Sequence, residues 1–226
     1  MIKIAIDGFS GSGKGELSKG LSKKLGLKHL DTGAIFRGIA CAFVQMGFEE
    51  LSEKIVENNI GKVNVSVTFD GDTQNILLDG KNINHLLRTE KTSQMASKVS
   101  VYAPVREKYL SIVREFSNNY DCIIDGRDIT SVVLPDADVK IFLNASEEIR
   151  AKRRYQENVQ KNIACTYEEV LANLQERDYR DSHRDIAPLK IVDDAFVVDN
   201  SNMGITETIE YCYNHIEKVL KEKGKK

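Results

Sequence analysis

The sequence predicts an α/β fold of three layers, in which a central parallel sheet is covered by helices on both faces. Short apolar runs typical of strands alternate with amphipathic helical stretches along most of the 226 residues, and this alternation indicates a parallel sheet. Hydrophobic residues make up 41% of the chain and charged residues 29%, a balance that excludes an intrinsically disordered protein. At this length we expect one core domain, residues 1–226, that carries a smaller insertion.

The order of the elements follows from hydrophobic spacing. After a glycine-rich loop, Leu17, Leu21 and Leu25 share one face of an expected helix. Thr166 and Glu169 have the spacing of a capping box at the start of another helix. The expected strands are residues 2–6, 27–30, 122–124, 139–143 and 195–198. The other expected helices are residues 34–46, 89–100, 104–116, the segment that follows Glu147, and a C-terminal helix.

A second pattern interrupts the α/β order near residue 60. Valines alternate with polar residues over 63–67, residues 69–72 supply a turn, and an apolar run follows at 76–78. Such runs on both sides of a turn are typical of an antiparallel hairpin. We expect residues 60–86 to form part of an inserted subdomain that extends over about 60–100.

Charge and cysteine content limit the partners and the location. The formal net charge is −2, whereas nucleic-acid-binding domains are usually strongly basic, so we expect no nucleic-acid partner. The four cysteines are widely spaced, form no CxxC pair, and are expected to be reduced thiols. The chain starts with a strand-like run in place of a signal peptide, and no apolar run approaches the ~20 residues that span a membrane. These features predict a cytoplasmic protein without a membrane partner.

A glycine-rich segment from Gly8 to Lys14 fits the phosphate-binding pattern GxxxxGK. Its place between a strand and a helix is the context that this motif requires. Glycines let several backbone N–H groups point at one phosphate chain, the helix N-terminus adds its positive end, and Lys14 adds a charge. The alternative interpretation is a glycine-rich turn that carries a surface lysine. The expected ATP contacts are Gly8, Phe9, Ser10, Gly11, Ser12, Gly13, Lys14, Gly15 and Glu16.

Polar side chains follow two further expected strands. Residues 31–33 (Asp-Thr-Gly) follow the second strand, with Arg37 one helical turn beyond, and residues 125–128 (Asp-Gly-Arg-Asp) follow the third. Ligands collect at the carboxyl ends of parallel strands. Asp125 occupies the position of the carboxylate that holds Mg²⁺, directly or through water, in phosphate-loop enzymes. In the alternative interpretation Asp125 and Asp128 are turn residues, because Asp-Gly is a turn dipeptide.

Two charged clusters lie further along the chain. The first mixes both signs over residues 177–185, and the second places four basic side chains between Arg150 and Arg154. Ion pairs along a solvated helix explain such patterns without any function. In a phosphoryl-transfer enzyme, the second cluster would instead form the edge of a closing lid, for which we expect residues 153–166.

Taken together, these segments resemble the bacterial cytidylate kinases, a family of nucleoside-monophosphate kinases with a phosphate-binding loop (P-loop). The resemblance runs nearly end to end and includes the hairpin insertion. The Asp-Gly-Arg-Asp segment and the order Arg-Asp…Arg-Asp-Ser…Arg…Ala-Pro-Leu are more specific than the P-loop, which many families share. The matching segments are residues 8–15, 30–37, 105–107, 125–128, 134–137 and 177–189.

The resemblance implies a P-loop kinase fold with a small NMP-binding subdomain, a short helical lid and a monomeric state. It implies transfer of the γ-phosphoryl group of ATP to CMP and dCMP, with Mg²⁺ as cofactor. In this family Thr32, Arg37 and Arg127 would hold the CMP phosphate, Ser97, Arg106 and Asp128 would bind cytosine, and Asp181 and Arg184 would contact the ribose. The catalytic set would be Lys14, Arg127, Arg153, Arg154 and Arg177. A carboxylate beside a guanidinium suits cytosine, which offers an amine next to acceptor atoms.

Four positions depart from the usual pattern of this family. Glu16 stands where Thr is usual, Phe9 replaces Pro, Phe36 replaces Tyr, and Thr130 replaces a Gly after the Asp-Gly-Arg-Asp segment. A carboxylate at position 16 would repel the α-phosphate unless it is paired with a cation or turned outward. Two alternatives therefore stay open. One is a kinase for another substrate such as UMP, AMP or shikimate, and the other is a nucleotide-binding protein of weak or altered kinase activity.

Overall fold

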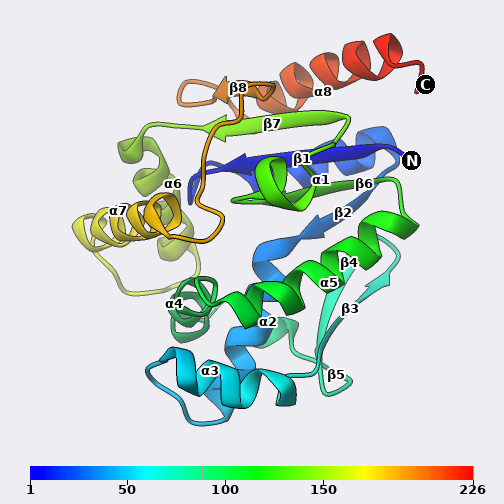
Figure 1. Ribbon diagram of the computed structural model, residues 1–226. Helices are drawn as coiled ribbons and strands as arrows, with labels where there is room; N and C mark the ends of the chain where they lie inside the picture. The colour runs from blue at the N-terminus through cyan, green and yellow to red at the C-terminus, as the bar shows by residue number, and fades with distance from the viewer. Residues whose placement is uncertain (88, 226) are drawn as a thin grey trace. The chain divides into compact units, whose positions relative to one another are not determined.

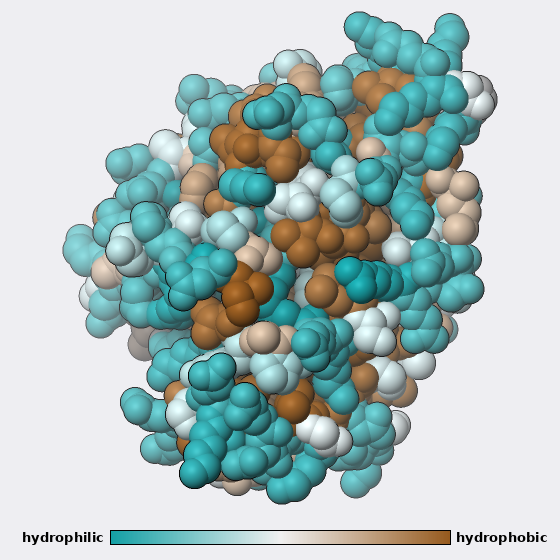
Figure 2. Space-filling model, in the orientation of Figure 1, coloured by the Kyte–Doolittle hydropathy of each residue, from teal (hydrophilic) through white to brown (hydrophobic). Residues whose placement is uncertain are grey.

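The structure, a computed structural model, describes residues 1–87 and 89–225. It contains two compact units, the first made of Met1–Leu27 together with Asp121–Lys226 and the second of Lys28–Tyr120 (Figure 1). On the face shown in Figure 2, hydrophilic residues predominate and hydrophobic residues form separate patches. Among the residues described, none of the helices combines the length and the apolar character that a membrane span needs.

A parallel sheet forms the centre of the first unit. Its strands are β1 (Lys3–Gly8), β6 (Cys122–Gly126), β7 (Val139–Asn144) and β8 (Phe196–Asp199), in the order β6-β1-β7-β8. Ile4 and Ile6 of β1 are fully buried, as expected for a strand covered on both faces. Ile6 pairs with Asp125 and Asp7 pairs with Gly126. The carboxyl ends of β1 and β6 therefore lie side by side.

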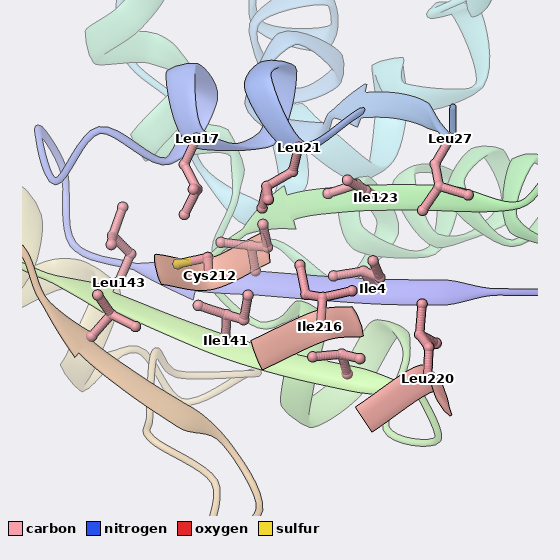
Figure 3. Packing of buried hydrophobic residues seen from close by; sticks show 13 residues of the cluster. Ile4, Leu17, Leu21, Leu27, Ile123, Ile141, Leu143, Cys212, Ile216 and Leu220 are labelled. Carbon is pink, nitrogen blue, oxygen red and sulfur yellow. The ribbon is translucent and has the colours of Figure 1, made fainter. Parts of the chain in front are cut away.

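Among the described residues of the first unit, four α-helices accompany this sheet, and two of them pack directly on it. They are α1 (Lys14–Leu25), α6 (Glu147–Gln160), α7 (Tyr167–His183) and α8 (Ile205–Glu222), with a π-helix at Ile129–Val133. The predicted apolar face of α1 is confirmed at Leu17 and Leu21, which are buried in one cluster with Ile141 of β7 and with Cys212 and Ile216 of α8 (Figure 3). Burial of this cluster joins the two helices to the sheet.

Helices α6 and α7 pack against each other around a smaller cluster that includes Val170 and Leu174. The predicted capping box of α7 is confirmed, because Thr166 Oγ1 accepts the N–H of Glu169 at 3.2 Å and the Glu169 carboxylate accepts the N–H of Thr166 at 2.8 Å. The expected lid, residues 153–166, corresponds to the end of α6 and the turn before α7. Its closure stays a prediction.

The second unit contains a small antiparallel sheet and several helices. The sheet has the order β3-β4-β5, with β3 (Val65–Asp70), β4 (Thr73–Leu78) and β5 (Lys81–Asn82). The other elements are β2 (Lys28–Asp31), α2 (Thr32–Gln45), α3 (Glu53–Asn59), α4 (Glu90–Val99), α5 (Ala103–Asn119), and 3₁₀ turns at Ile60–Lys62 and Asn84–Leu86. The predicted hairpin is confirmed, with Gly71 at φ 57° in its turn. The separate role of residues 60–100 as a subdomain stays a prediction.

Some elements differ from the expectation drawn from the sequence. Helix α2 begins at Thr32, two residues earlier than predicted, because Asp31 caps it by accepting the N–H of Ala34 at 3.0 Å. Helix α3 has no apolar periodicity to reveal it, since Val56 is its one buried residue. The π-helix at Ile129–Val133, directly after residues 125–128, has no counterpart among the elements expected from the sequence.

Replacing Gly38 by alanine should destabilise the second unit. A Cβ at Gly38 of α2 would lie 2.6 Å from Ile76 Cγ2 and 3.3 Å from Val65 Cγ1, so α2 or the hairpin has to shift. We expect the free energy of unfolding, measured with urea, to fall by about 1–3 kcal/mol. Gly61→Ala is the control, because a Cβ there meets no heavy atom within 4 Å. Equal stability of the two variants would contradict this packing.

Candidate functional site

The P-loop joins β1 to α1, and two of its glycines adopt positions that a side chain would prevent. A Cβ at Gly8, where φ is 153°, would lie 2.0 Å from the carbonyl oxygen of Leu143 in the neighbouring strand β7. Gly13 caps α1 in the left-handed region, with φ 94°. The loop therefore bends tightly against the sheet and ends at the N–H groups of a helix N-terminus, an arrangement suited to phosphate.

Lys14 is buried inside this loop. Its ammonium donates hydrogen bonds to the carbonyl oxygens of Gly8 and Phe9, both at 2.7 Å, and lies 3.4 Å from Ser12 Oγ. Burial, and after it the charge of Arg127, lower the pKa of Lys14 well below its usual value. A phosphate chain would oppose both effects, because negative charge favours the protonated lysine.

Glu16 is largely exposed to solvent. Its side chain is 71% exposed and forms an ion pair with Lys19 at 3.4 Å, within the first turns of α1. Both conditions that make a carboxylate tolerable at this position are therefore met. The replacement of the usual Thr removes a hydroxyl group but places no unpaired negative charge against the phosphates.

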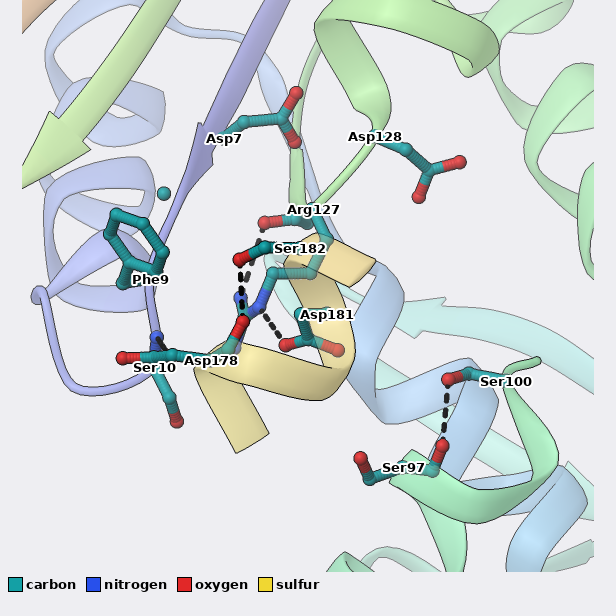
Figure 4. A network of polar contacts seen from close by, with 12 residues as sticks. Asp7, Phe9, Ser10, Ser97, Ser100, Arg127, Asp128, Asp178, Asp181 and Ser182 are labelled. Atoms are coloured by element: carbon teal, nitrogen blue, oxygen red, sulfur yellow. Dashed lines mark hydrogen bonds and ion pairs between the residues drawn. The ribbon is translucent and has the colours of Figure 1, made fainter. Parts of the chain in front are cut away.

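A buried ion pair between α6 and α7 is hydrogen-bonded to the P-loop. Arg150 of α6 and Asp178 of α7 contact each other, and their side chains are only 3% and 9% exposed. Asp178 accepts the N–H of Ser10 at 3.2 Å (Figure 4), and Arg150 donates to the carbonyl oxygen of Ser10 at 2.9 Å. Arg150 therefore anchors the P-loop. Its burial contradicts the interpretation of a solvated face for this member of its sequence cluster.

The phenylalanine at position 9 has contacts of its own in place of the usual proline. The rings of Phe9 and Phe142 meet edge to face, with centroids 5.8 Å apart. The guanidinium of Arg150 lies 5.2 Å from the Phe9 ring centroid, close enough for a cation–π interaction. The substitution therefore adds a contact between the loop and its anchor.

Beside the P-loop, the end of β6 carries Arg127, which donates through Nε to Asp181 of α7 at 2.8 Å (Figure 4). Burial alone would raise the pKa of Asp181, but Arg127, and after it Arg184, outweigh burial and hold that pKa below its usual value. Arg127 and Asp181 are both predicted substrate contacts, and the structure brings them together as an ion pair.

Asp128 and Arg184 form a second buried pair in this unit. Their side chains are 3% and 4% exposed, and Arg184 Nη2 lies 3.3 Å from Asp128 Oδ1. Arg184 Nε also donates to the carbonyl oxygen of Ala187 at 2.8 Å. Asp128 is the N-cap residue of the π-helix, yet its side chain makes no capping hydrogen bond.

Asp7 caps the π-helix instead. It is fully buried at the end of β1 and accepts the N–H of Ile129 at 2.9 Å and both the N–H and the hydroxyl of Thr130 at 2.7 Å. Burial raises the pKa of Asp7 to about 6 despite these hydrogen bonds, and the charge of Asp128 adds to the increase. Sequence reasoning missed Asp7, although its position at a strand end next to the P-loop was a usable signal.

Arg153, a predicted catalytic residue, is held beside the P-loop. It donates to the side-chain oxygen of Asn200 at 3.0 Å and to the backbone oxygen of Asn200 at 2.8 Å. Asn200 in turn donates to the carbonyl oxygen of Ser12 at 3.1 Å. Asn200 directly follows β8, so its place at a strand end could have identified it, but sequence reasoning did not.

The other two arginines of the predicted catalytic set lie on α6 and α7. Arg154 is partly exposed and pairs with Glu157 of its own helix at 2.9 Å, which matches the interpretation of a solvated face. Arg177 lies on α7 next to Asp178, the anchor of the P-loop. Their approach to a phosphoryl group stays a prediction.

In the second unit, the predicted phosphate contacts Thr32 and Arg37 lie in the first turns of α2. Thr32 is buried, and Arg37 Nη2 donates to Asp31 at 2.8 Å. The N–H of Asp31 donates to Gln74 Oε1 of the hairpin at 2.7 Å. Burial would raise the pKa of Asp31, but Arg37, and after it His29, reverse the effect and hold it below its usual value. The hairpin thus fixes the residue that orients Arg37.

The predicted base contacts of the second unit, Ser97 and Arg106, are linked through Ser100. Ser100 Oγ donates to the carbonyl oxygen of Ser97 at 2.9 Å (Figure 4), and Arg106 Nη1 donates to the carbonyl oxygen of Ser100 at 3.4 Å. The Arg106 guanidinium lies 5.9 Å from the ring centroid of Tyr109, and Phe36 stacks on that ring at 4.4 Å. Phe36 therefore contributes a stacking contact without the hydroxyl of the usual tyrosine.

The predicted substrate contacts thus fall into two sets. The first unit brings together Arg127 with Asp181 and Asp128 with Arg184, and the second unit links Ser97 with Arg106 and places Thr32 near Arg37. A single site formed by both sets stays a prediction.

A magnesium ion fits the oxygen donors of the first unit. Among the described residues, no group of three or more His, Cys, Asp or Glu side chains could hold a metal ion. Such a group is not required, because Mg²⁺ in phosphoryl-transfer sites usually binds through one or two carboxylates and the substrate phosphates. Asp125, buried at the end of β6, is a donor of this kind.

Comparisons of the sequence with known proteins point to one family. A family model described as cytidylate kinase matches residues 4–218. A cytidylate kinase from Thermosipho melanesiensis is 43% identical over 223 residues, which cover 99% of this chain and 98% of that protein. One from Photobacterium profundum is 40% identical and covers 98% and 97%. Among solved structures, an uncharacterized protein from Eubacterium ventriosum has a TM-score of 0.52 at 11% identity, covering 96% of this chain and 99% of that one. That likeness concerns the fold alone.

Replacing Asp178, the ion-pair partner of Arg150, should destabilise the first unit. Asp178→Ala leaves the buried Arg150 charge and the Ser10 N–H without this partner. We expect the free energy of unfolding, measured with urea, to fall by about 3–5 kcal/mol. Glu176→Ala on the same helix is the control, because Glu176 is 67% exposed in its pair with Arg180 and such pairs contribute about 0–1 kcal/mol. A similar loss in both variants would contradict the anchoring role.

Proposed function

We propose, from the fact that this chain belongs to the cytidylate kinase family, that it transfers the γ-phosphoryl group of ATP to CMP, giving ADP and CDP. The observation that carries the proposal, beyond family membership, is the register of β1 with β6. Asp7 pairs with Gly126, so the P-loop and the segment that carries Arg127 and Asp128 leave the sheet from neighbouring positions. A loop suited to a triphosphate therefore starts beside two residues suited to a nucleotide acceptor.

On the donor side, the P-loop binds the triphosphate through backbone N–H groups and Lys14. The ammonium of Lys14, held by the carbonyl oxygens of Gly8 and Phe9, can exchange one of them for a β- or γ-phosphate oxygen. Arg150 and Asp178 keep Ser10 fixed while this happens. Such preorganisation matters because phosphoryl transfer depends on positioning and charge compensation more than on covalent help from the protein.

Magnesium completes the donor side of this proposal. When bound, Mg²⁺ neutralises charge on the β- and γ-phosphates. Asp125 would hold it, directly or through water. Lys14 lies within the electrostatic reach of Asp125, so Lys14 and a metal ion held by Asp125 would act on the same phosphate chain.

On the acceptor side, Arg127, Arg37 and Thr32 would hold the phosphate of CMP. Asp128, with Ser97 and Arg106, would recognise cytosine, because its carboxylate accepts a hydrogen bond from the exocyclic amine. Uracil has a carbonyl at that position and would face the carboxylate with a lone pair. Asp181 and Arg184 would contact the ribose. No general base is needed, because the acceptor phosphate oxygen is already a nucleophile.

Arginines would stabilise the charge that develops during transfer. Arg153, Arg154 and Arg177 are the candidates, and the lid, residues 153–166, would bring the first two to the phosphoryl group. Closure would also exclude water, which suppresses hydrolysis of ATP. Arg153 would first have to break its hydrogen bond to Asn200. Its approach to the phosphoryl group can therefore be coupled to movement of the loop after β8.

The proposal extends to three finer points. The acceptor includes dCMP as well as CMP, the protein acts as a monomer without nucleic acid, and it works in the cytoplasm. The last point draws support from the four free cysteines, since a reducing compartment keeps thiols unpaired.

Replacing Lys14 should abolish most of the activity without unfolding the protein. Lys14→Met keeps the apolar stem and removes the charge, so we expect kcat for CMP phosphorylation to fall at least ~100-fold. A coupled ADP-release assay with CMP, dCMP, UMP and AMP measures the rate and the substrate preference together. A rate near that of the wild type would reject the P-loop assignment.

Glu16→Gln is the matched control for Lys14→Met. Because Glu16 is exposed and paired with Lys19, its neutralisation should change kcat and the KM for ATP by less than about twofold.

In the same assay, a wild type that prefers UMP or AMP would favour a kinase for another nucleotide. A wild type that binds ATP but releases no ADP would favour a nucleotide-binding protein of weak activity.

Asp128→Asn should reduce the preference for CMP over UMP. The amide keeps the shape of the side chain, but with its oxygen accepting from Arg184 it would present its NH2 donor to the amine of cytosine, and we expect kcat/KM for CMP to fall about 100-fold. The KM for ATP should stay within about twofold of the wild type. Asp136→Asn, an exposed position in the same unit, is the control. An equal loss for CMP and UMP would argue against recognition of the base by Asp128.

A further inference from the structure

The start of the π-helix is capped by a residue of strand β1, and this arrangement affects Asp128. An aspartate at an N-cap position usually accepts N–H groups of its own helix. Here Asp7 accepts the N–H groups of Ile129 and Thr130, at 2.9 and 2.7 Å, and Asp128 makes no capping bond. Asp128 instead lies 3.3 Å from Arg184. In Figure 4 the carboxylates of Asp7 and Asp128 lie on opposite sides of the helix start.

The hydroxyl of Thr130 completes this cap. It donates to Asp7 Oδ2 at 2.7 Å, in addition to the two N–H donors. Thr130 is 1% exposed and Asp7 is fully buried, so water cannot readily take the place of a lost donor. A buried carboxylate that loses a hydrogen bond carries a large part of its desolvation cost uncompensated. Thr130, which stands where this family usually has glycine, thus stabilises the buried charge of Asp7.

The negative charge of Asp128 near Asp7 makes the hydrogen bond from Thr130 more important. Burial, with a contribution from the charge of Asp128, raises the pKa of Asp7 to about 6, while the Thr130 hydroxyl has the opposite effect. Protonation of Asp7 would turn one acceptor oxygen into a donor, and the cap of the π-helix would weaken. The N–H groups of Ile129 and Thr130 would then need another acceptor, and the nearest carboxylate along the chain is that of Asp128.

We propose that Asp7 and Thr130 are positioning residues for base selectivity. The Thr130 hydroxyl fixes Asp7 as the cap of the π-helix, and Asp128 is thereby kept from capping its own helix and stays oriented toward the cytosine amine. This inference rests on the proposed function, because it assigns the orientation of the residue that would bind the base. It adds to that function two residues that would not touch the nucleotide.

The test removes the hydroxyl without changing the shape of the side chain. Thr130→Val should lower the ratio of kcat/KM for CMP to that for UMP by about tenfold. The KM for ATP should change by less than about twofold, because this hydroxyl donates to Asp7, which precedes the P-loop. Should Thr130→Val fail to fold, Thr130→Ala removes the same hydroxyl with a smaller side chain.

Two control variants separate this role from a general effect on the π-helix. Thr130→Ser keeps the hydroxyl. Ser131→Ala removes a neighbouring hydroxyl whose buried oxygen has no hydrogen-bond partner in the part of the chain that the structure describes. Both should keep the selectivity of the wild type within about twofold. Unchanged selectivity in Thr130→Val would overturn the proposal, and so would equal losses for ATP and CMP or the same loss in Ser131→Ala.

A second measurement needs no turnover. Titration of the Asp7 carboxyl group by NMR should give a higher pKa in Thr130→Val than in the wild type, because the hydroxyl stabilises the ionised form. The value should not change in Ser131→Ala. A wild type that does not phosphorylate CMP would reject the proposed function alone. An active, selective wild type whose Thr130→Val variant is equally selective, or shows no change in the Asp7 titration, would reject only the positioning role.

Discussion

Charges that are removed from water at the carboxyl end of a parallel sheet need internal partners, and this requirement organises the first unit. A buried charge that loses its partner destabilises a protein by several kcal/mol, about 3–5 in measured cases. The partners found here are Arg150 with Asp178, Arg127 with Asp181, Arg184 with Asp128, and Asp7 with the start of the π-helix. Because they come from β1, from the segment after β6, and from α6 and α7, electrostatic pairing ties together segments that are distant in the sequence.

Helix α7 joins two of these partnerships. Asp178 and Asp181 are three residues apart and therefore lie on one face of the helix. The first holds the P-loop at Ser10 and the second holds Arg127. A displacement of α7 would therefore move the proposed donor loop and the proposed acceptor contact together. This common support shows how the charged cluster over residues 177–185 would serve the proposed site, although its pattern of alternating signs is also typical of a solvated helix.

The sequence was informative where chemistry or periodicity is local. The P-loop, the hairpin and the capping box at Thr166 each depend on residues within one short segment, and the structure contains all three. Partnerships between distant segments leave no such pattern. Arg150 belongs to a basic run that resembles a solvated face, yet it is buried against Ser10 and Asp178. Asp7 likewise precedes a recognisable motif, but its role depends on Thr130, 123 residues later.

The position of β1 in the sheet has a consequence for biosynthesis. This strand ends at Gly8, yet both of its neighbours come from the second half of the chain, beginning at Cys122 and Val139. The apolar strand that leads into the P-loop therefore emerges from the ribosome long before it can be paired, and closing so large a loop is slow. During that interval its unpaired edges are exposed to aggregation, and a chaperone that shields this strand in the nascent chain would favour correct assembly.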